Sequence, residues 1–104
     1  MGKPVQGQGF RGRVFEACRK VPRGKVTTYR DIARKLGTSP RAVGQALRTN
    51  QDPATPCHRV VKSDLSVGGY QGKPNNRKKE KTLRSEGVAF SKGKVDGECL
   101  FRLQ

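Results

Sequence analysis

Two consecutive helices are encoded by the stretch TYRDIARKLGTSPRAVGQALRT, residues 28–49. Thr28 is a favourable N-cap residue, and Asp31, three positions later, can answer it in a capping box. Apolar residues then recur at helical spacing, and the glycine at position 37 ends the helix. The first half of the stretch therefore predicts a helix over residues 29–36.

The second half carries its own start signal. Ser39 is a capping residue, and Pro40 fills the first helical position, where its missing N–H is not needed. We therefore predict a helix from Pro40 to Thr49, joined to the first by a three-residue turn. This arrangement is a helix-turn-helix, which in a strongly basic chain is typical of a DNA-binding protein.

The charge balance supports the same partner. The 104 residues contain 23 Lys and Arg against 8 Asp and Glu, a net charge of +15. Such an imbalance predicts a polyanionic partner, and nucleic acid is favoured over a membrane because no apolar helix or lipidation signal accompanies the charge. With no visible signal peptide, we expect a cytoplasmic protein, located at the nucleoid when bound to DNA.

The rest of the chain predicts one small, mainly helical domain. Residues 1–9 are expected to form a flexible tail, and residues 10–104 a single domain. Apolar spacing predicts a helix over residues 10–21, and residues 74–86 form a basic helix whose charges are typical of a solvated face. Short extended pieces are expected at Val26-Thr27 and Val60-Val61, and a hairpin or packing tail over residues 88–104. The predicted fold class is mainly α with small β elements, a winged-helix-like helix-turn-helix domain.

A possible reactive cysteine lies in the sequence Pro56-Cys57-His58-Arg59-Val60. The thiolate is the nucleophilic form of cysteine, and a neighbouring cation or a helix N-terminus favours it. The alternative is a structural cysteine beside a surface histidine. Three widely spaced cysteines and a single histidine predict free thiols, with no metal site, disulfide framework or cofactor.

These residues resemble the O6-alkylguanine-DNA alkyltransferases, suicide DNA-repair proteins. The resemblance runs from about Phe10 to Phe90. It rests on the signature PCHRVV at residues 56–61 and on five further motifs in the family's order: GKVTTY at 24–29, RAVG at 41–44, RTN at 48–50, VGGY at 67–70 and SEG at 85–87.

The resemblance implies catalytic roles for five residues. Cys57 is the alkyl acceptor, His58 activates it through a bridging water, and Glu86 orients the histidine. Tyr29 assists the departing guanine, and Asn50 is the hinge that ties the recognition helix to the active-site turn. Without the resemblance, Glu86 reads as a solvated carboxylate in the last turn of a helix, and Tyr29 as a packing residue.

The resemblance also implies how DNA is bound. A monomer holds double-stranded DNA through the minor groove and flips the O6-alkylguanine out of the duplex. The second helix is almost without bulk, which suits a narrow groove; the alternative explanation for its small residues is close packing against a neighbouring helix. The implied DNA and base contacts are Arg41, Ala42, Gly44, Val60, Tyr70 and Gln71, with Arg41 entering the base stack.

Two other functions remain open at this stage. In length and C-terminal layout the chain also resembles the alkyltransferase-like proteins, which bind alkylated guanine without chemistry and typically carry tryptophan at the position of Cys57. A small architectural or regulatory DNA-binding module would explain the charge and the helix-turn-helix, but not the cysteine signature. The turn Asp64-Leu65-Ser66 lacks a glycine often found there, which leaves the shape of this loop open.

Overall fold

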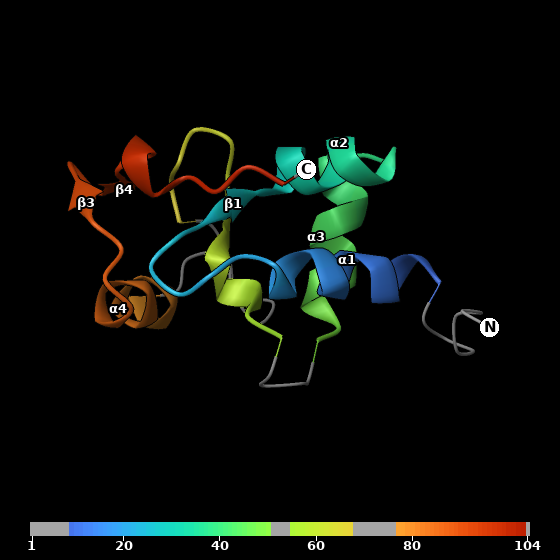
Figure 1. The fold of residues 1–104 in the computed structure, drawn as a ribbon, viewed down its shortest axis with the longest axis horizontal. Helices are drawn as coiled ribbons and strands as arrows, with labels where there is room; N and C mark the ends of the chain where they lie inside the picture. Colours follow the sequence, from blue (N-terminus) through green and yellow to red (C-terminus); the bar gives the residue numbers. More distant parts are fainter. Residues whose placement is uncertain (1–8, 51–54, 68–76, 104) are drawn as a thin grey trace.

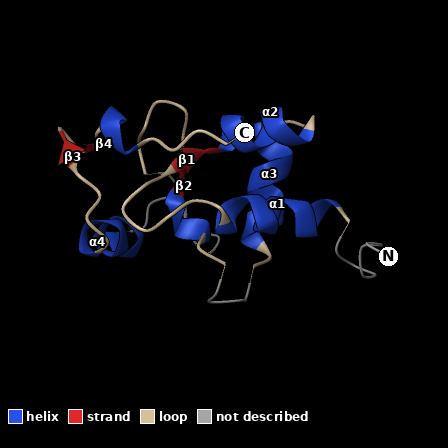
Figure 2. Cartoon of the chain, viewed as in Figure 1, coloured by secondary structure: helices blue, strands red, loops and turns tan. Residues whose placement is uncertain are grey.

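The computed structural model describes residues 9–50, 55–67 and 77–103. Three helices gather at one end of the molecule and a fourth helix with a small hairpin at the other (Figure 1). The helices are α1 (Phe10–Arg19), α2 (Tyr29–Leu36), α3 (Pro40–Arg48) and α4 (Arg77–Ser85). The strands are β1 (Thr27–Thr28), β2 (Val60–Val61), β3 (Phe90–Ser91) and β4 (Lys94–Val95), and the 3₁₀ turns are η1 (Cys57–Arg59) and η2 (Gly97–Cys99). The mainly helical class with small β elements is thus confirmed (Figure 2).

The capping signals of the helix-turn-helix act as predicted. The Thr28 hydroxyl accepts a hydrogen bond from the Asp31 N–H at 3.0 Å, and the Ser39 hydroxyl accepts one from the Ala42 N–H at 3.1 Å. Gly37 ends α2 in the left-handed conformation, with φ +70°. These local interactions fix where α2 stops and α3 begins, and so set the first turn of each helix.

Helices α1, α2 and α3 enclose the first hydrophobic core. The helical spacing predicted for residues 10–21 brings Val14 and Cys18 into this core, although α1 itself ends at Arg19. Helix α1 also contributes Ala17. The other buried members come from α2, α3 and β2: Ile32, Ala33, Val43, Ala46, Leu47 and Val60. The three helices therefore form one packed unit.

Strand β2 connects this core to a second one. It pairs in parallel with β1, with Thr27 opposite Val60 and Thr28 opposite Val61. Because successive side chains of a strand point to opposite faces, Val60 packs in the first core and Val61 in the second. The second core contains Val26, Val61, Leu83, Val88, Val95 and Cys99. The segment after Cys57 is thus anchored on both sides.

The C-terminal segment forms the expected hairpin and then returns to the centre. Strands β3 and β4 pair antiparallel, with Phe90 opposite Val95. Past η2, the Phe101 N–H donates to the Val26 carbonyl at 2.7 Å, and Val26 bridges to Leu100. Residues 100–101 therefore extend the edge of β1. In the described part of the chain, no helix is long and apolar enough to cross a membrane.

In the turn Asp64-Leu65-Ser66, which lacks a glycine, the leucine adopts the left-handed conformation. Leu65 has φ +71°, and its side chain packs against the second core. Asp64 accepts hydrogen bonds from the N–H and the hydroxyl of Ser66, at 3.0 and 2.6 Å. These bonds and the packing of Leu65 stabilise a conformation that normally favours glycine.

Gly24 is a position where the fold requires glycine. Its φ is +89°, and a Cβ atom there would lie 3.2 Å from the Glu86 carbonyl oxygen. Gly37 has a similar φ of +70° but open space around it. We expect Gly24→Ala to lower the free energy of unfolding by clearly more than Gly37→Ala, whose cost should be about 1–2 kcal/mol for the left-handed conformation alone. Urea unfolding of both variants measures this, and equal losses would show that the contact with Glu86 imposes no constraint.

Candidate active site

Cys57 begins the 3₁₀ turn η1, directly after the buried Pro56. The Cys57 N–H donates to the Thr55 carbonyl at 2.8 Å, and the Cys57 side chain is half-buried against the first core. A turn of three residues is too short to supply the helix dipole considered for this cysteine. The electrostatics of the site must therefore come from side chains.

Asn50 links the end of α3 to this turn. Its Nδ2 amide donates to the Thr55 carbonyl at 3.3 Å and to the Cys57 Sγ at 3.4 Å. Arg19, at the end of α1, donates to the Thr55 hydroxyl at 2.8 Å. Residues at the C-terminal ends of α1 and α3 therefore hold Thr55, which precedes Pro56. The Cys57 sulfur itself accepts a hydrogen bond from the Asn50 amide.

The Glu86 carboxylate binds both residues that follow the cysteine. His58 Nε2 lies 2.9 Å from Glu86 Oε2, while Arg59 donates through Nε to Oε1 and through Nη2 to Oε2, each at 2.9 Å. Arg59 also donates through Nη1 to the Val21 carbonyl at 2.9 Å. The pair of parallel bonds from one guanidinium fixes the carboxylate in position and orientation.

The Glu86 side chain is only 8% exposed, so the reading of a solvated carboxylate is wrong. Burial raises the pKa of Glu86, but the hydrogen bonds from Arg59 and His58 outweigh it and hold the pKa below its usual range. An ionised carboxylate can only accept, so the Nε2 atom of His58 carries the hydrogen in this contact.

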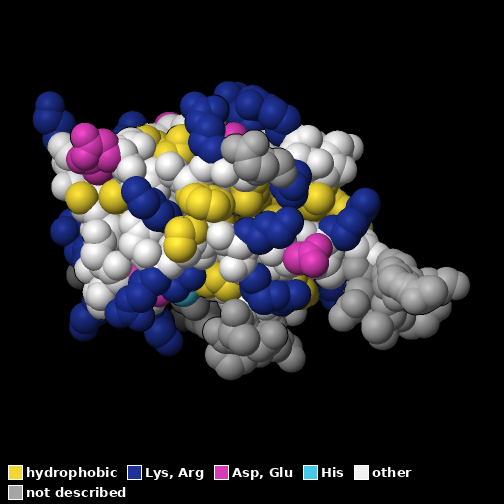
Figure 3. Space-filling model, viewed as in Figure 1, with side chains coloured by type: hydrophobic (Ala, Val, Ile, Leu, Met, Phe, Trp, Pro, Cys, Tyr) yellow, Lys and Arg dark blue, Asp and Glu magenta, His cyan; other side chains and the backbone are white. Residues whose placement is uncertain are grey.

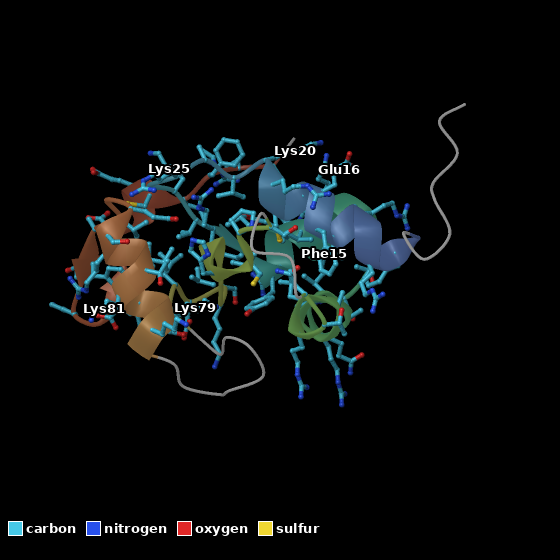
Figure 4. The ribbon with its side chains drawn as sticks, turned by 90° about the horizontal axis from the view of Figure 1, so that it is seen from below. Phe15, Glu16, Lys20, Lys25, Lys79 and Lys81 are labelled. Atoms are coloured by element: carbon cyan, nitrogen blue, oxygen red, sulfur yellow. The ribbon has the colours of Figure 1, made fainter. Side chains whose placement is uncertain are left out.

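Lys79 is the functional candidate that sequence reasoning missed. It was included in the solvated basic face of residues 74–86, yet it is completely buried. In Figure 4, Lys79 lies on the side of α4 that faces the body of the molecule, and Lys81 on the opposite side. The signal was present in the spacing: Lys79, Leu83 and Glu86 are separated by four and three residues, so they share the inward face of one helix.

The ammonium group of Lys79 reaches the phenol of Tyr29. Its Nζ donates to the Tyr29 Oη at 3.4 Å and lies 5.6 Å from the centre of the ring. Burial lowers the pKa of Lys79 to about 8, opposed by the nearby thiols of Cys57 and Cys18. Burial, followed by the same two thiols, raises the pKa of Tyr29 to about 12. A proton donor, a neutral phenol and the candidate nucleophile thus share one environment.

A hollow of about 560 Å³ opens beside Tyr29, between the first turns of α2 and α3 and the turn that follows β2. Arg41, in the first turn of α3, is exposed at this hollow. A Cβ atom at Gly44 would lie 4.0 Å from the Tyr29 ring, which is ordinary contact, so packing does not demand glycine there. The lining residues are Tyr29, Arg30, Pro40, Arg41, Gly44, Lys62, Ser63 and Asp64.

The remaining predicted contacts divide into two groups. Ala42 is half-buried in α3, and Val60 is fully buried in β2, so the Val60 side chain is not available to a ligand. Tyr70 and Gln71 lie outside the described residues. Cys18, Cys57 and Cys99 are free thiols, as predicted.

Comparison with known proteins identifies the family. The model described as "6-O-methylguanine DNA methyltransferase, DNA binding domain" matches residues 9–88. A methylated-DNA–protein-cysteine methyltransferase of Methanothermobacter thermautotrophicus is 41% identical over 82 residues, which is 78% of this chain and 46% of that protein. The chain therefore spans about half the length of this curated relative.

Solved structures share the fold. The O6-methylguanine-DNA methyltransferase of Pyrococcus kodakaraensis has a TM-score of 0.69 at 44% identity, over 77% of this chain and 47% of that one. S. pombe Atl1, in complex with damaged DNA containing O6-carboxymethylguanine, has a TM-score of 0.77 at 28% identity, over 95% of this chain and all of that one. Since the family model covers most of its length, the chain belongs to the family of the 6-O-methylguanine DNA methyltransferase DNA-binding domain.

Proposed function

We propose that this chain repairs DNA by transferring the alkyl group of O6-alkylguanine irreversibly to its own Cys57. The observation that carries the proposal is the half-buried thiol of Cys57, which accepts a hydrogen bond from Asn50 and is followed directly by a histidine bound to a buried carboxylate. A nucleophile is activated by an adjacent base that a third group orients, and Cys57, His58 and Glu86 match these three roles. Residues 10–104 act as one unit, without a metal or cofactor.

In the proposed step, the Cys57 sulfur attacks the alkyl carbon while the bond between that carbon and guanine O6 breaks. The thiol proton passes through one bridging water to His58 Nδ1, and Glu86 stabilises the resulting imidazolium through Nε2. The product on the protein is a thioether. Because a thioether is a poor leaving group, each molecule acts once.

The departing guanine leaves as an anion and requires a donor. Tyr29, with its pKa raised to about 12, keeps its proton at neutral pH and is suited to donate a hydrogen bond to the base. Lys79 donates to the same phenol oxygen. Its positive charge makes the Tyr29 hydroxyl a stronger hydrogen-bond donor to the departing guanine. Lys79 is thus proposed as a positioning residue that acts through Tyr29.

The hollow beside Tyr29 is the proposed place where damaged duplex DNA is opened. Two helix N-termini and the cations of Arg30, Arg41 and Lys62 surround it, which favours phosphate groups. The smooth surface of α3, with Ala42 and Gly44, enters the minor groove, and Arg41 replaces the extruded base in the stack. Backbone groups of Cys57, Val60 and Gln71 and the ring of Tyr70 would hold that base. The protein acts as a cytoplasmic monomer.

A second candidate function is lesion sensing without transfer. The likeness to S. pombe Atl1, whose whole length the chain covers, favours it. Cys57 argues for transfer, since this sequence has a cysteine at the position where the alkyltransferase-like proteins typically carry tryptophan.

The two candidates differ in what they do to the DNA. We expect an oligonucleotide duplex containing O6-methylguanine to regain guanine, in an amount that stops at one equivalent per protein molecule. Cys57→Ala should abolish the repair and keep DNA binding largely intact, because the thiol performs chemistry and the basic surface supplies affinity. Chromatography of the digested duplex measures the guanine. Unchanged O6-methylguanine, despite tight binding by the parent protein, would support the sensing function instead.

Arg41 should act in extrusion of the base. Arg41→Ala is expected to slow transfer from duplex DNA far more than transfer from the free base O6-benzylguanine, which requires no unstacking. The difference reflects the few kcal/mol that base flipping costs. Second-order rate constants for both substrates, in parent and variant, test this. Equal losses on the two substrates would assign Arg41 to the pocket or the fold.

The burial of Lys79 predicts a pH-dependent stability. Its folded pKa, about 8, is lower than its ordinary value of 10.5. Between these values the unfolded chain binds more protons, so the contribution of Lys79 to stability is least favourable below pH 8 and improves as pH rises to 10.5. Relative to Lys79→Met, the parent should gain up to about 3 kcal/mol over this window. Denaturant unfolding at several pH values measures the difference, and parallel profiles would contradict a buried ammonium group.

A further inference from the structure

The β3–β4 hairpin lies beyond residues 9–88, the segment that the family model matches. Its tip is formed by Lys92 and Gly93, both at positive φ, and Lys92, Gly93 and Lys94 are exposed. Its base is held by packing: Val95 is buried in the second core, and the Arg84 guanidinium lies 4.5 Å from the centre of the Phe90 ring. A supported base with a basic tip presents its charges to an external partner.

The hairpin is attached to the turn that borders the hollow. The Val95 N–H donates to the Leu65 carbonyl at 2.9 Å, and the turn is closed by the Lys62 N–H, which donates to the Ser66 carbonyl at 3.0 Å. This backbone connection places β4 beside Asp64. The hydrogen bonds from Ser66 lower the pKa of Asp64, and the charges of Lys94 and Lys62 add to this effect.

The hairpin therefore adds positive charge beside the turn that borders the hollow. Lys62 and Asp64 line the hollow together with Arg41, and Lys94 precedes Val95, whose N–H is bonded to the same turn. Asp64 is already engaged by both donors of Ser66. Within residues 9–50, 55–67 and 77–103, no hydrogen bond or ion pair joins the ammonium group of Lys92 or Lys94 to another residue. The two lysines are available to an anionic ligand.

We propose that the hairpin is a wing that binds the phosphate backbone of duplex DNA beside the lesion, through Lys92 and Lys94. This inference rests on the proposed function, because it takes the hollow at Arg41 as the place where the damaged base leaves the helix. Phosphate groups follow one another along both strands of a duplex, so the exposed lysines of a hairpin that is bonded to the turn at the hollow suit phosphates next to the lesion. An acidic protein partner is less favoured, because the tip of the hairpin offers it charges but no apolar side chain to bind.

The test compares two variants that each lose two positive charges. In the wing variant, Lys92→Asn and Lys94→Gln, asparagine is chosen because it tolerates the left-handed conformation of residue 92. The control variant is Lys20→Gln and Lys25→Gln, whose side chains lie on the edge of the molecule opposite α3 in Figure 4. Figure 3 shows that Lys and Arg side chains are spread over one whole face, so a charge-matched control is required.

Binding to a duplex containing O6-methylguanine is measured by fluorescence anisotropy over a range of salt concentrations. We expect the slope of log Kd against log salt to fall by about 0.9 for each lost phosphate contact in the wing variant, and by clearly less in the control. A third variant, Lys92→Arg with Lys94→Arg, should keep the parent slope because it retains both charges. Thermal unfolding of each variant establishes that the fold is intact.

Two outcomes would overturn the wing. If the wing variant has the same slope of log Kd against log salt as the parent protein, Lys92 and Lys94 contact no phosphate. An equal reduction in wing and control variants would show that only the total charge matters. Failure of the parent protein to bind the duplex at all is a different result, since it would remove the proposed function itself. An acidic protein partner would leave the DNA slope unchanged and so counts against the wing.

Discussion

The Glu86 carboxylate and the Arg59 guanidinium together join three segments that are far apart in sequence. Glu86 follows α4, His58 and Arg59 belong to η1, and the same Arg59 guanidinium binds the Val21 carbonyl after α1. Removing one member of a buried ion pair typically costs about 3–5 kcal/mol, because the other charge stays unpaired. The network is thus both a structural joint and the device that orients the histidine next to Cys57.

The second constraint is the burial of a lysine in a chain that already carries a net charge of +15. A lysine that serves only solubility belongs on the surface, where the exposed Lys81 of the same helix lies. Lys79 instead sits with Tyr29 in the environment of two thiols, where its desolvation is partly offset by the phenol oxygen and the ring. Such a strongly perturbed group beside a candidate nucleophile is typical of a functional site.

Local signals in the sequence predicted the helices, because caps such as Thr28 and Ser39 act within four residues. The extended pieces also followed from local pattern, whereas the hairpin was only one of two alternatives for residues 88–104. Lys79 was misread because charge alone suggested a solvated face, although its spacing from Leu83 and Glu86 placed it inside. The bond from Arg59 to Val21 and the left-handed Leu65 depend on contacts between distant segments, which no local pattern contains.

In the proposed function, this arrangement makes Cys57, and no other thiol, the alkyl acceptor. Cys18 and Cys99 are buried, and burial raises the pKa of Cys18 to about 12, so neither is suited to attack an external alkyl carbon. The most direct measurement is the mass of the intact protein, followed by peptide mapping, after mixing with DNA that contains O6-methylguanine. We expect a gain of one methylene mass per molecule, located at Cys57. An unchanged mass, or a methyl group on Cys18 or Cys99, would contradict it.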